Sequence, residues 1–318
     1  MSAPMGIAED KIAVARLSVY SNTFLTSTKL VAGILMGSVG VISEALHSGI
    51  DLVAAIMARY SVKKSAEPPD KDHRYGHGKF ENLSGMIEGV LIFIAAIVIV
   101  YEASLKFFVD FQVELLGAGM VIMALSAIIN YVVSRRLHKM ARETESPALE
   151  ADAYHLSTDV WTSAGVFIAL VLIQVTGWQL FDPIIALVVA SFIIYAAFDV
   201  TKRSAQGLLD LSLPDEEIKA IERVMNEHHA EFLNFHRLRA RKTGSERQID
   251  LHLTVPLNLS VKEGHDLVEH LEGEIRKELP GSIIVVHIEP CKEECERCKL
   301  QGQAGPLKCN GNQRPGAR

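Results

Sequence analysis

Long apolar runs separated by short polar connectors dominate the first two thirds of the chain. About 20 residues of helix span a hydrocarbon layer of ~30 Å, and each run reaches that length. The six runs cover roughly residues 13–36, 40–61, 82–106, 114–134, 149–175 and 180–201. The first run is the most polar, and we expect its polar side to face other helices. The pattern predicts an α-helical polytopic membrane domain with six transmembrane helices.

Basic residues in the connectors predict the orientation of these helices. The connectors at 37–40, 109–112 and 176–179 contain no Lys or Arg, whereas basic residues follow the second, fourth and sixth runs. Cytoplasmic loops of membrane proteins are enriched in Lys and Arg, so we expect both termini in the cytoplasm. The acidic start, with Glu9 and Asp10, argues against a cleaved signal peptide.

Beyond about residue 205 the pattern changes to that of a small α+β domain. Pro214 and acidic residues open an amphipathic helix, and Ser260 with Glu263 predicts a capping box for a second helix. The expected helix, two strands, helix and strand cover residues 215–225, 233–242, 247–256, 260–279 and 283–289. This α-β-β-α-β order predicts a compact open-faced domain.

Composition changes this picture at two points. The net charge of -6 offers no basic surface for nucleic acid, so no nucleic-acid partner is expected. The four cysteines all lie near the C-terminus and provide no disulfide framework for the body of the chain. The cysteines are Cys291, Cys295, Cys298 and Cys309. They either chelate metal as part of a flexible tail or are incidental.

Two ionisable pairs with identical spacing interrupt the apolar runs. His47 and Asp51 lie in the second run, and His155 and Asp159 lie in the fifth. A spacing of four residues places both members of a pair on one helix face. Each pair lies about 8 residues, or ~12 Å, from one end of its run, so the pairs can meet near the midplane. Two imidazoles and two carboxylates form a donor set suited to zinc.

The alternative is that neighbouring hydroxyl groups or backbone carbonyls satisfy each pair separately. Ionisable groups at membrane depth are costly and usually face a partner or a pathway, so two matched pairs favour one shared metal site. Metal ligation requires deprotonated side chains, and metal therefore competes with protons for them. This competition is a physical basis for exchanging metal against protons.

Further metal-ligand residues lie outside the apolar runs. Asp70, His73 and His77 share one loop, where they form either a second metal site or an ordinary solvated loop. On the predicted strands, Ile249, Leu251, Leu253 and Val255 occupy one face and leave His252 on the other, while His287 and Glu289 share a face. His236 lies on the first strand and His265 on the second helix. These residues either form a metal cluster or are isolated surface histidines. Three histidines have no evident partner and are taken as surface residues: His228, His229 and His270.

The chain resembles the cation diffusion facilitators in several features taken together. They are the six spans, the paired ligands, the segment Gly76-His77-Gly78-Lys79, the Leu213–Glu217 entry to the last domain and the α-β-β-α-β order of that domain. The likeness covers roughly residues 10–291 and is greatest to the bacterial zinc and iron efflux members. It implies a homodimer in the lipid of the bacterial inner membrane that exchanges a divalent metal for protons by alternating access. It also implies that the cytoplasmic domain resembles copper metallochaperones in fold.

The resemblance assigns roles to individual residues. The transport site would comprise His47, Asp51, His155 and Asp159, and the loop site Asp70, His73 and His77. A bridged metal pair in the cytoplasmic domain would bind to His236, His252, His265, His287 and Glu289. Lys79 and Asp210 would form a charge interlock near the membrane surface. Zinc would be both the transported ion and an ion held by the cytoplasmic domain.

Three features depart from the family pattern. His47 occupies a position where many bacterial members carry Asp, and the added imidazole should favour zinc over iron or manganese. Glu289 replaces a usual Asp, and the cysteine-containing tail is additional. The expected parts are a cytoplasmic N-terminus (1–12), the transmembrane domain (13–206), a cytoplasmic metal-binding domain (207–291) and a flexible tail (292–318).

Two functional hypotheses follow from the sequence. The first is a divalent-cation/proton antiporter that exports zinc, and also cadmium, iron or another divalent metal, from the cytoplasm. The alternative is a metal-responsive membrane scaffold whose cytoplasmic domain binds metal and recruits partners without transport. An enzyme is not expected, since the chain contains no GxSxG, Walker-type or HExxH motif.

Overall fold

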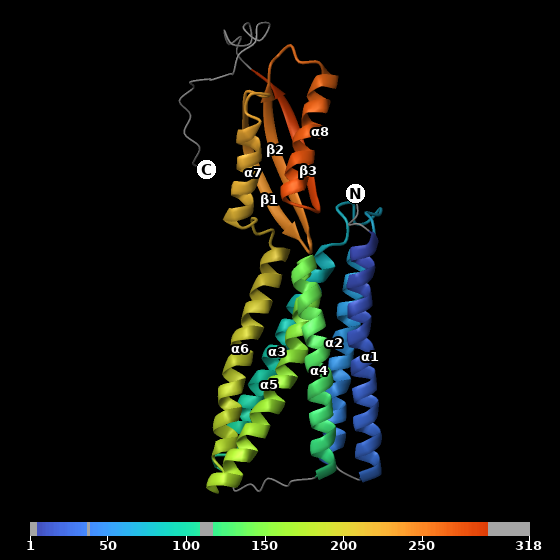
Figure 1. Ribbon diagram of the computed structural model, residues 1–318, viewed down its shortest axis with the longest axis vertical. Coiled ribbons are helices and arrows are strands. Elements are labelled where there is room, and N and C mark those ends of the chain that lie inside the picture. Colours follow the sequence, from blue (N-terminus) through green and yellow to red (C-terminus); the bar gives the residue numbers. More distant parts are fainter. Residues whose placement is uncertain (1–4, 37–38, 109–116, 292–318) are drawn as a thin grey trace. The chain divides into compact units, whose positions relative to one another are not determined.

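The computed structural model describes residues 5–36, 39–108 and 117–291. The chain forms two compact units, a helical domain that ends at Leu209 and a C-terminal domain that begins at Asp210. Figure 1 traces both units along the sequence. The predicted connector at 109–112 and the tail from residue 292 lie outside the described residues.

Six long helices make up the described part of the helical domain, and each predicted apolar run lies on one of them. They are α1 (Met5–Met36), α2 (Val39–Ser65), α3 (Lys79–Leu105), α4 (Gly117–Thr144), α5 (Pro147–Thr176) and α6 (Phe181–Leu208). By length and apolar composition, α3, α5 and α6 each qualify as a membrane span. The helices α1, α2 and α4 are equally long but carry more polar residues.

Local signals at both ends explain where α5 begins and ends. Ser146 is the N-cap, and its hydroxyl accepts a hydrogen bond from the backbone N–H of Leu149 at 3.4 Å, while Pro147 occupies the first helical turn. Gly177 follows the last turn with φ 73°, a left-handed conformation that suits glycine. The helix that carries His155 and Asp159 is therefore defined at both ends by its own sequence.

Small residues allow α3 and α6 to pack closely. A Cβ atom at Gly85 would lie 2.6 Å from the Ser204 hydroxyl oxygen, and one at Gly89 would lie 2.3 Å from that of Thr201. The spacing of these two glycines is the one that lets membrane helices approach backbone to backbone. The α3–α6 pair thus forms one side of the helical domain, and α1, α2, α4 and α5 share a separate apolar core.

The outer and inner surfaces of the helices differ in polarity. Large apolar side chains remain exposed on the outside, among them Leu35 (81%), Phe167 (68%) and Tyr195 (75%), as expected of groups that face lipid. Inside, the fully buried carboxylate of Glu81 accepts a hydrogen bond from the Lys11 ammonium at 2.6 Å. The hydroxyls of Ser65 and Ser146 donate to the same carboxylate, which connects α1, α2, α3 and the start of α5.

The C-terminal domain is a three-stranded sheet covered on one face by two helices. Its elements are α7 (Asp215–Glu227), β1 (Asn234–Thr243), β2 (Glu246–Val255), α8 (Val261–Glu278) and β3 (Ser282–Pro290). The strand order is β1-β2-β3, and β2 pairs with β3 in parallel so that His252 lies opposite His287. The predicted α+β fold is confirmed, including the capping box of Ser260 and Glu263 at the start of α8.

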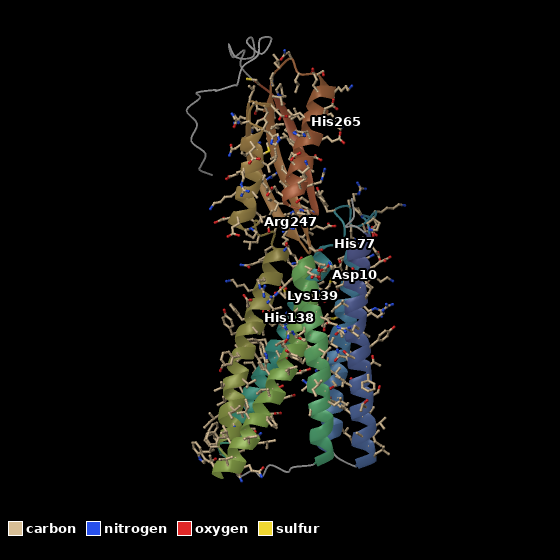
Figure 2. All side chains as sticks on the ribbon, in the orientation of Figure 1. Asp10, His77, His138, Lys139, Arg247 and His265 are labelled. Carbon is tan, nitrogen blue, oxygen red and sulfur yellow. The ribbon has the colours of Figure 1, made fainter. Side chains whose placement is uncertain are left out.

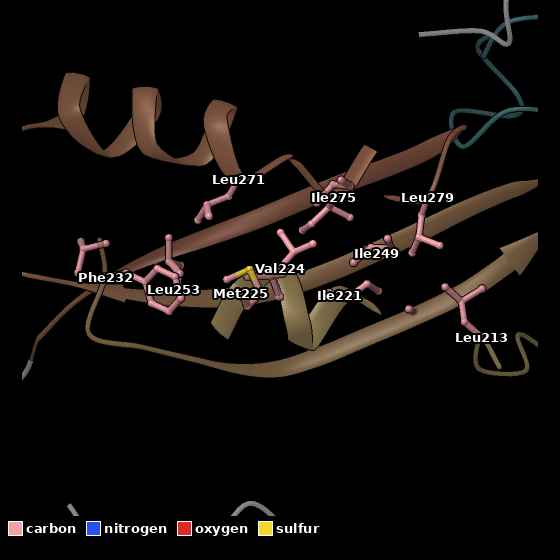
Figure 3. Packing of buried hydrophobic residues seen from close by; sticks show 14 residues of the cluster. Leu213, Ile221, Val224, Met225, Phe232, Ile249, Leu253, Leu271, Ile275 and Leu279 are labelled. Atoms are coloured by element: carbon pink, nitrogen blue, oxygen red, sulfur yellow. The ribbon is translucent and has the colours of Figure 1, made fainter. Parts of the chain in front are cut away.

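The core of this domain lies between the sheet and its helices. The side chains of Ile249 and Leu253 on β2 pack with Met225 of α7 and with Leu271 and Ile275 of α8 (Figure 3). The alternate residues of β2 point to the other face, as the period-two pattern predicts. The sheet therefore has one apolar face and one face that carries His252.

We expect the substitution Leu251→Ala to destabilise the C-terminal domain by about 3 kcal/mol, because it opens a cavity in a fully packed core. Leu251 is 1% exposed in this core. Hydrogen exchange of the β2 amides in the full chain measures the loss. The control Asp250→Ala changes the neighbouring exposed side chain and should alter stability by less than about 0.5 kcal/mol. Equal protection of the β2 amides in both variants would contradict the described core.

Candidate functional site

The two predicted pairs of intramembrane ligands converge between α2 and α5. The His155 imidazole lies with its Nε2 3.0 Å from Oδ1 of Asp51. The Nε2 of His47 lies 4.0 Å from the same carboxylate oxygen. One ligand atom each from His47, Asp51 and Asp159 lies within 4.8 Å of the others. Three of the four side chains thus form a close group, and His155 joins it through its contact with Asp51.

The four side chains differ in their exposure to the surroundings. Asp51 is 3% exposed and His155 is 7% exposed, so this ionisable pair is buried in the protein. Asp159 is half-buried, and His47 is exposed on the outer side of the group. The buried Asp51–His155 pair is therefore the inner part of the group, and His47 is its accessible part.

Polar residues that the sequence analysis missed support this quartet. The Asn130 side-chain amide on α4 donates to Oδ2 of Asp159 at 3.0 Å. The buried Lys29 ammonium on α1 donates to the hydroxyl of Ser48, the residue after His47, at 2.8 Å. A lone Asn or Lys inside an apolar run has no partner spacing that would reveal it, but its depth in a predicted membrane helix is itself a signal.

Several buried polar atoms near these groups have no hydrogen-bond partner in the part of the chain that is described. They include Nδ1 of His155, Oδ1 of Asn130, Oδ2 of Asp152 on α5 and Oε2 of Glu88 on α3. Buried polar atoms in native proteins are normally satisfied by protein, water or ions. The interior around His155 therefore has unused capacity to bind a polar ligand or ion.

The loop between α2 and α3 brings Asp70, His73 and His77 together. Their ligand atoms lie within 4.8 Å of one another, with His77 Nε2 3.1 Å from Oδ2 of Asp70. The loop is not a wound helical turn: the backbone N–H of Gly76 bonds to the His73 carbonyl, and Gly76 adopts φ 84°. This turn, which favours glycine, brings the two histidine rings to a centroid distance of 4.7 Å.

Hydrogen bonds order the donor atoms of this loop. The backbone N–H groups of His73 and Asp72 donate to Asp70 and hold the pKa of its carboxyl below the ordinary value. The Nδ1 of His77 lies 3.3 Å from the Glu67 carbonyl, an arrangement that leaves Nε2 for Asp70 or for a metal. The side chain of His77 is buried within the helical domain, where Figure 2 labels it.

A third group lies on the polar face of the C-terminal sheet. Glu289 of β3 contacts two strands, with Oε1 2.8 Å from Nδ1 of His252 and Oε2 3.4 Å from Nε2 of His236. His287 lies with its Nε2 3.8 Å from Oε1 of Glu289, and its ring lies 4.8 Å from that of His252. The hydrogen bond from His252 holds the pKa of Glu289 below its ordinary value. The Glu289 side chain thus reaches a histidine on the adjacent strand β2 and one on β1, the strand beyond it.

His265 lies away from these residues in the described chain. His265 lies on α8 (Figure 2), where its Nε2 is 4.0 Å from Oε2 of Glu269 on the same helix. The group of donors within 4.8 Å of one another contains His236, His252 and Glu289, and neither His287 nor His265 is among them. For His265 the reason is topological, because α8 covers the apolar face of the sheet and His252 points from the opposite face.

The remaining predicted positions have other recorded partners. The Lys79 ammonium donates to the Leu208 carbonyl at 3.2 Å, and Asp210 pairs with Arg241 at 2.8 Å. The Lys79–Asp210 interlock remains a prediction. The backbone N–H of Cys291 bonds to the Val255 carbonyl, while Cys295, Cys298 and Cys309 lie outside the described residues.

Comparison with known proteins identifies the family. The model of the cation efflux transmembrane domain matches residues 15–209, and that of the cation efflux protein cytoplasmic domain matches residues 213–291. The chain belongs to the cation diffusion facilitator family. It is a membrane-embedded cation efflux transporter, and its family is one of transporters rather than enzymes.

Similar proteins align over most of the chain. The uncharacterized transporter sll1263 of Synechocystis is 35% identical over 88% of this chain and 90% of that protein. The cation-efflux pump FieF of Shewanella oneidensis is 29% identical over 88% of this chain and 94% of the relative. A solved structure of CzrB, described as a proposed zinc transporter, is 31% identical and covers 25% of this chain and 98% of its own, with a TM-score of 0.24.

We expect Asn130→Ala to weaken cation binding at the quartet by about 10-fold to 100-fold, since partners that orient a metal ligand usually contribute that much. The change removes the hydrogen bond to Asp159 without removing a proposed ligand. Zinc titration of the purified full chain measures the affinity. The control Asn22→Ala removes another buried amide, whose bonds go to Ser18 on its own helix, and should leave the affinity unchanged. Equal losses in both variants would contradict a specific role for Asn130.

Proposed function

We propose that this cation efflux transporter is a zinc/proton antiporter whose transport site comprises His47, Asp51, His155 and Asp159. The observation that carries the proposal is the contact of 3.0 Å between Nε2 of His155 and Oδ1 of Asp51 inside the helical domain. It joins the two helices that supply all four donors.

The contact links metal binding to proton release. A nitrogen and a carboxylate oxygen at 3.0 Å share a proton, which the imidazole donates to the carboxylate. When His155 is protonated on both ring nitrogens, a metal ion takes the lone pair of Nε2 only after the Nε2 proton has left the site. The same atoms therefore hold either a proton or a metal ion. Release of metal on the far side of the membrane then allows the pair to take up a proton and return.

The donor set supports zinc as the transported ion. Two imidazole nitrogens and two carboxylate oxygens suit the tetrahedral coordination of zinc, and the two carboxylates offset the charge of a divalent ion in a buried site. A site with more oxygen and less nitrogen would suit manganese or magnesium better. His47 is the residue that raises the nitrogen content, and it lies on the exposed side of the quartet.

Similarity to relatives supports the direction and the assembly. The FieF relatives are described as cation-efflux pumps, which agrees with export from the cytoplasm of a bacterial cell across the inner membrane. The matching model of the C-terminal domain is named for dimerisation, and we infer that two copies of the chain form the transporter. Both termini then lie in the cytoplasm, as the distribution of basic residues predicts.

The loop and the sheet surface supply accessory sites in this proposal. Asp70, His73 and His77 would receive zinc in the loop between α2 and α3, and the C-terminal domain would hold it at His236, His252, His287 and Glu289. Each of these groups combines imidazole nitrogens with a carboxylate of lowered pKa. They would bind zinc on the side from which it is exported.

We expect Asp51→Asn and Asp159→Asn each to abolish zinc uptake into inside-out vesicles, because each removes a charge that offsets the ion but preserves the side-chain shape. The control Asp182→Asn removes a different carboxylate of the helical domain, which binds Lys106 at 2.6 Å, and should retain transport. Size-exclusion chromatography checks that all variants assemble alike. Transport at the unmodified rate in both quartet variants would exclude this site.

A second substitution tests the selectivity. We expect His47→Asp to broaden transport toward cadmium, iron and manganese, because it replaces an imidazole nitrogen by a carboxylate oxygen. His47→Asn is the matched control, since it removes the imidazole without adding a charge. Flux of each metal into proteoliposomes with an imposed pH gradient gives the profile. An unchanged metal profile in His47→Asp would show that His47 does not determine selectivity.

A further inference from the structure

A fourth group of metal-ligand side chains lies in the helical layer of the C-terminal domain. His228 ends α7, Glu231 follows it in the next turn, and His270 lies on α8. One donor atom from each lies within 4.8 Å of the others. The two imidazole rings meet edge to face, with centroids 5.0 Å apart. Residues far apart in the sequence thus meet because α7 packs beside α8.

Local hydrogen bonds orient His228 for metal binding. Its Nδ1 lies 2.9 Å from the Val224 carbonyl in the last turn of α7, a partner that accepts a proton from that nitrogen. The lone pair is then on Nε2, which is the arrangement of a histidine that binds metal through Nε2. The carbonyl end of α7 also favours positive charge at this position. The backbone N–H of Glu231 bonds to the His228 carbonyl, which fixes the carboxylate-bearing residue in the same turn.

Two carboxylates lie near the histidines, those of Glu231 and Glu274, and only Glu231 is taken as a ligand of the group. Glu274, one turn beyond His270 on α8, accepts a hydrogen bond from the Lys277 ammonium at 2.6 Å, and this bond offsets its charge. Donor atoms that bind one zinc ion lie roughly 3.4 Å apart when each is ~2.1 Å from the metal. His270 and Glu231 are exposed, so small side-chain rotations can close the present separations.

We propose that His228, Glu231 and His270 form a zinc-binding site on the helical side of the C-terminal domain, with water completing the coordination. The group lies on a different layer from His236, His252 and Glu289, which occupy the other face of the sheet, and it shares no residue with them. A zinc ion held there connects the end of α7 to α8. The ion therefore stabilises the domain whether or not the transport site is occupied.

The test is the number of zinc ions bound by the full-length protein, measured by equilibrium dialysis with zinc alone. The double variant His228→Ala/His270→Ala is expected to bind one zinc fewer per chain than the wild type. The matched control is His229→Ala, an exposed histidine in the same turn whose Nδ1 also lies beside a backbone carbonyl, that of Asn226, at 2.7 Å. This control should bind the wild-type number of zinc ions. The same number in the double variant and the wild type would overturn the proposal.

Modification of the wild-type protein provides a second measurement that does not depend on how a variant folds. Diethyl pyrocarbonate reacts with exposed imidazoles, and mass spectrometry locates the products. We expect zinc to slow the reaction of His228 and His270 at least tenfold and to leave His229 unaffected. Equal rates for His228 and His270 with and without zinc would overturn the proposal. Neither result depends on zinc transport, so the site and the proposed antiport can fail independently.

Discussion

The contact between Asp51 and His155 sets the conditions that the rest of the helical domain has to satisfy. An ionisable pair inside a membrane protein is tolerated only when its partners are held in place and lipid is kept away from it. Here α2 and α5 supply the pair, while Asn130 of α4 and Lys29 of α1 support its surroundings. The tight glycine-mediated packing of α3 on α6 completes the domain beside them. A site that is proposed to hold a proton and a metal ion in turn needs such a scaffold, because the helices have to keep their positions when either ion leaves.

The donor groups form a series from exposed to buried. Asp70 and His73 of the loop lie in solvent, Glu289 and His252 of the sheet are half-buried, and Asp51 is almost fully enclosed. Each group pairs imidazole with carboxylate, but burial determines what the combination can do. In solvent, protons and ions exchange without coupling to the rest of the chain. At the buried Asp51–His155 pair, a change of ligand has to be accompanied by a change of charge, and the proposed exchange across the membrane rests on this requirement.

Much of this arrangement could be predicted where a periodic pattern exists. The helices followed from apolar length, the alternation around Leu251 predicted which face of β2 is buried, and the four-residue spacing of His155 and Asp159 placed them on one side of α5. The missed residues have no such pattern. Asn130 lies deep in a long helix and Glu81 in the polar first turn of another, and only tertiary packing reveals their partners. His265 shows the reverse case, since the resemblance suggested a ligand while α8 covers the opposite face of the sheet in the described chain, so its role remains a prediction.

The central claim is that one metal ion is bound by two nitrogens and two oxygens between α2 and α5. Crystals of the full chain grown with zinc, with diffraction data recorded on both sides of the zinc absorption edge, test it most directly. The account predicts an anomalous peak about 2.0–2.2 Å from donor atoms of His47, Asp51, His155 and Asp159. Zinc peaks at the loop and the C-terminal domain with none at this quartet would contradict it.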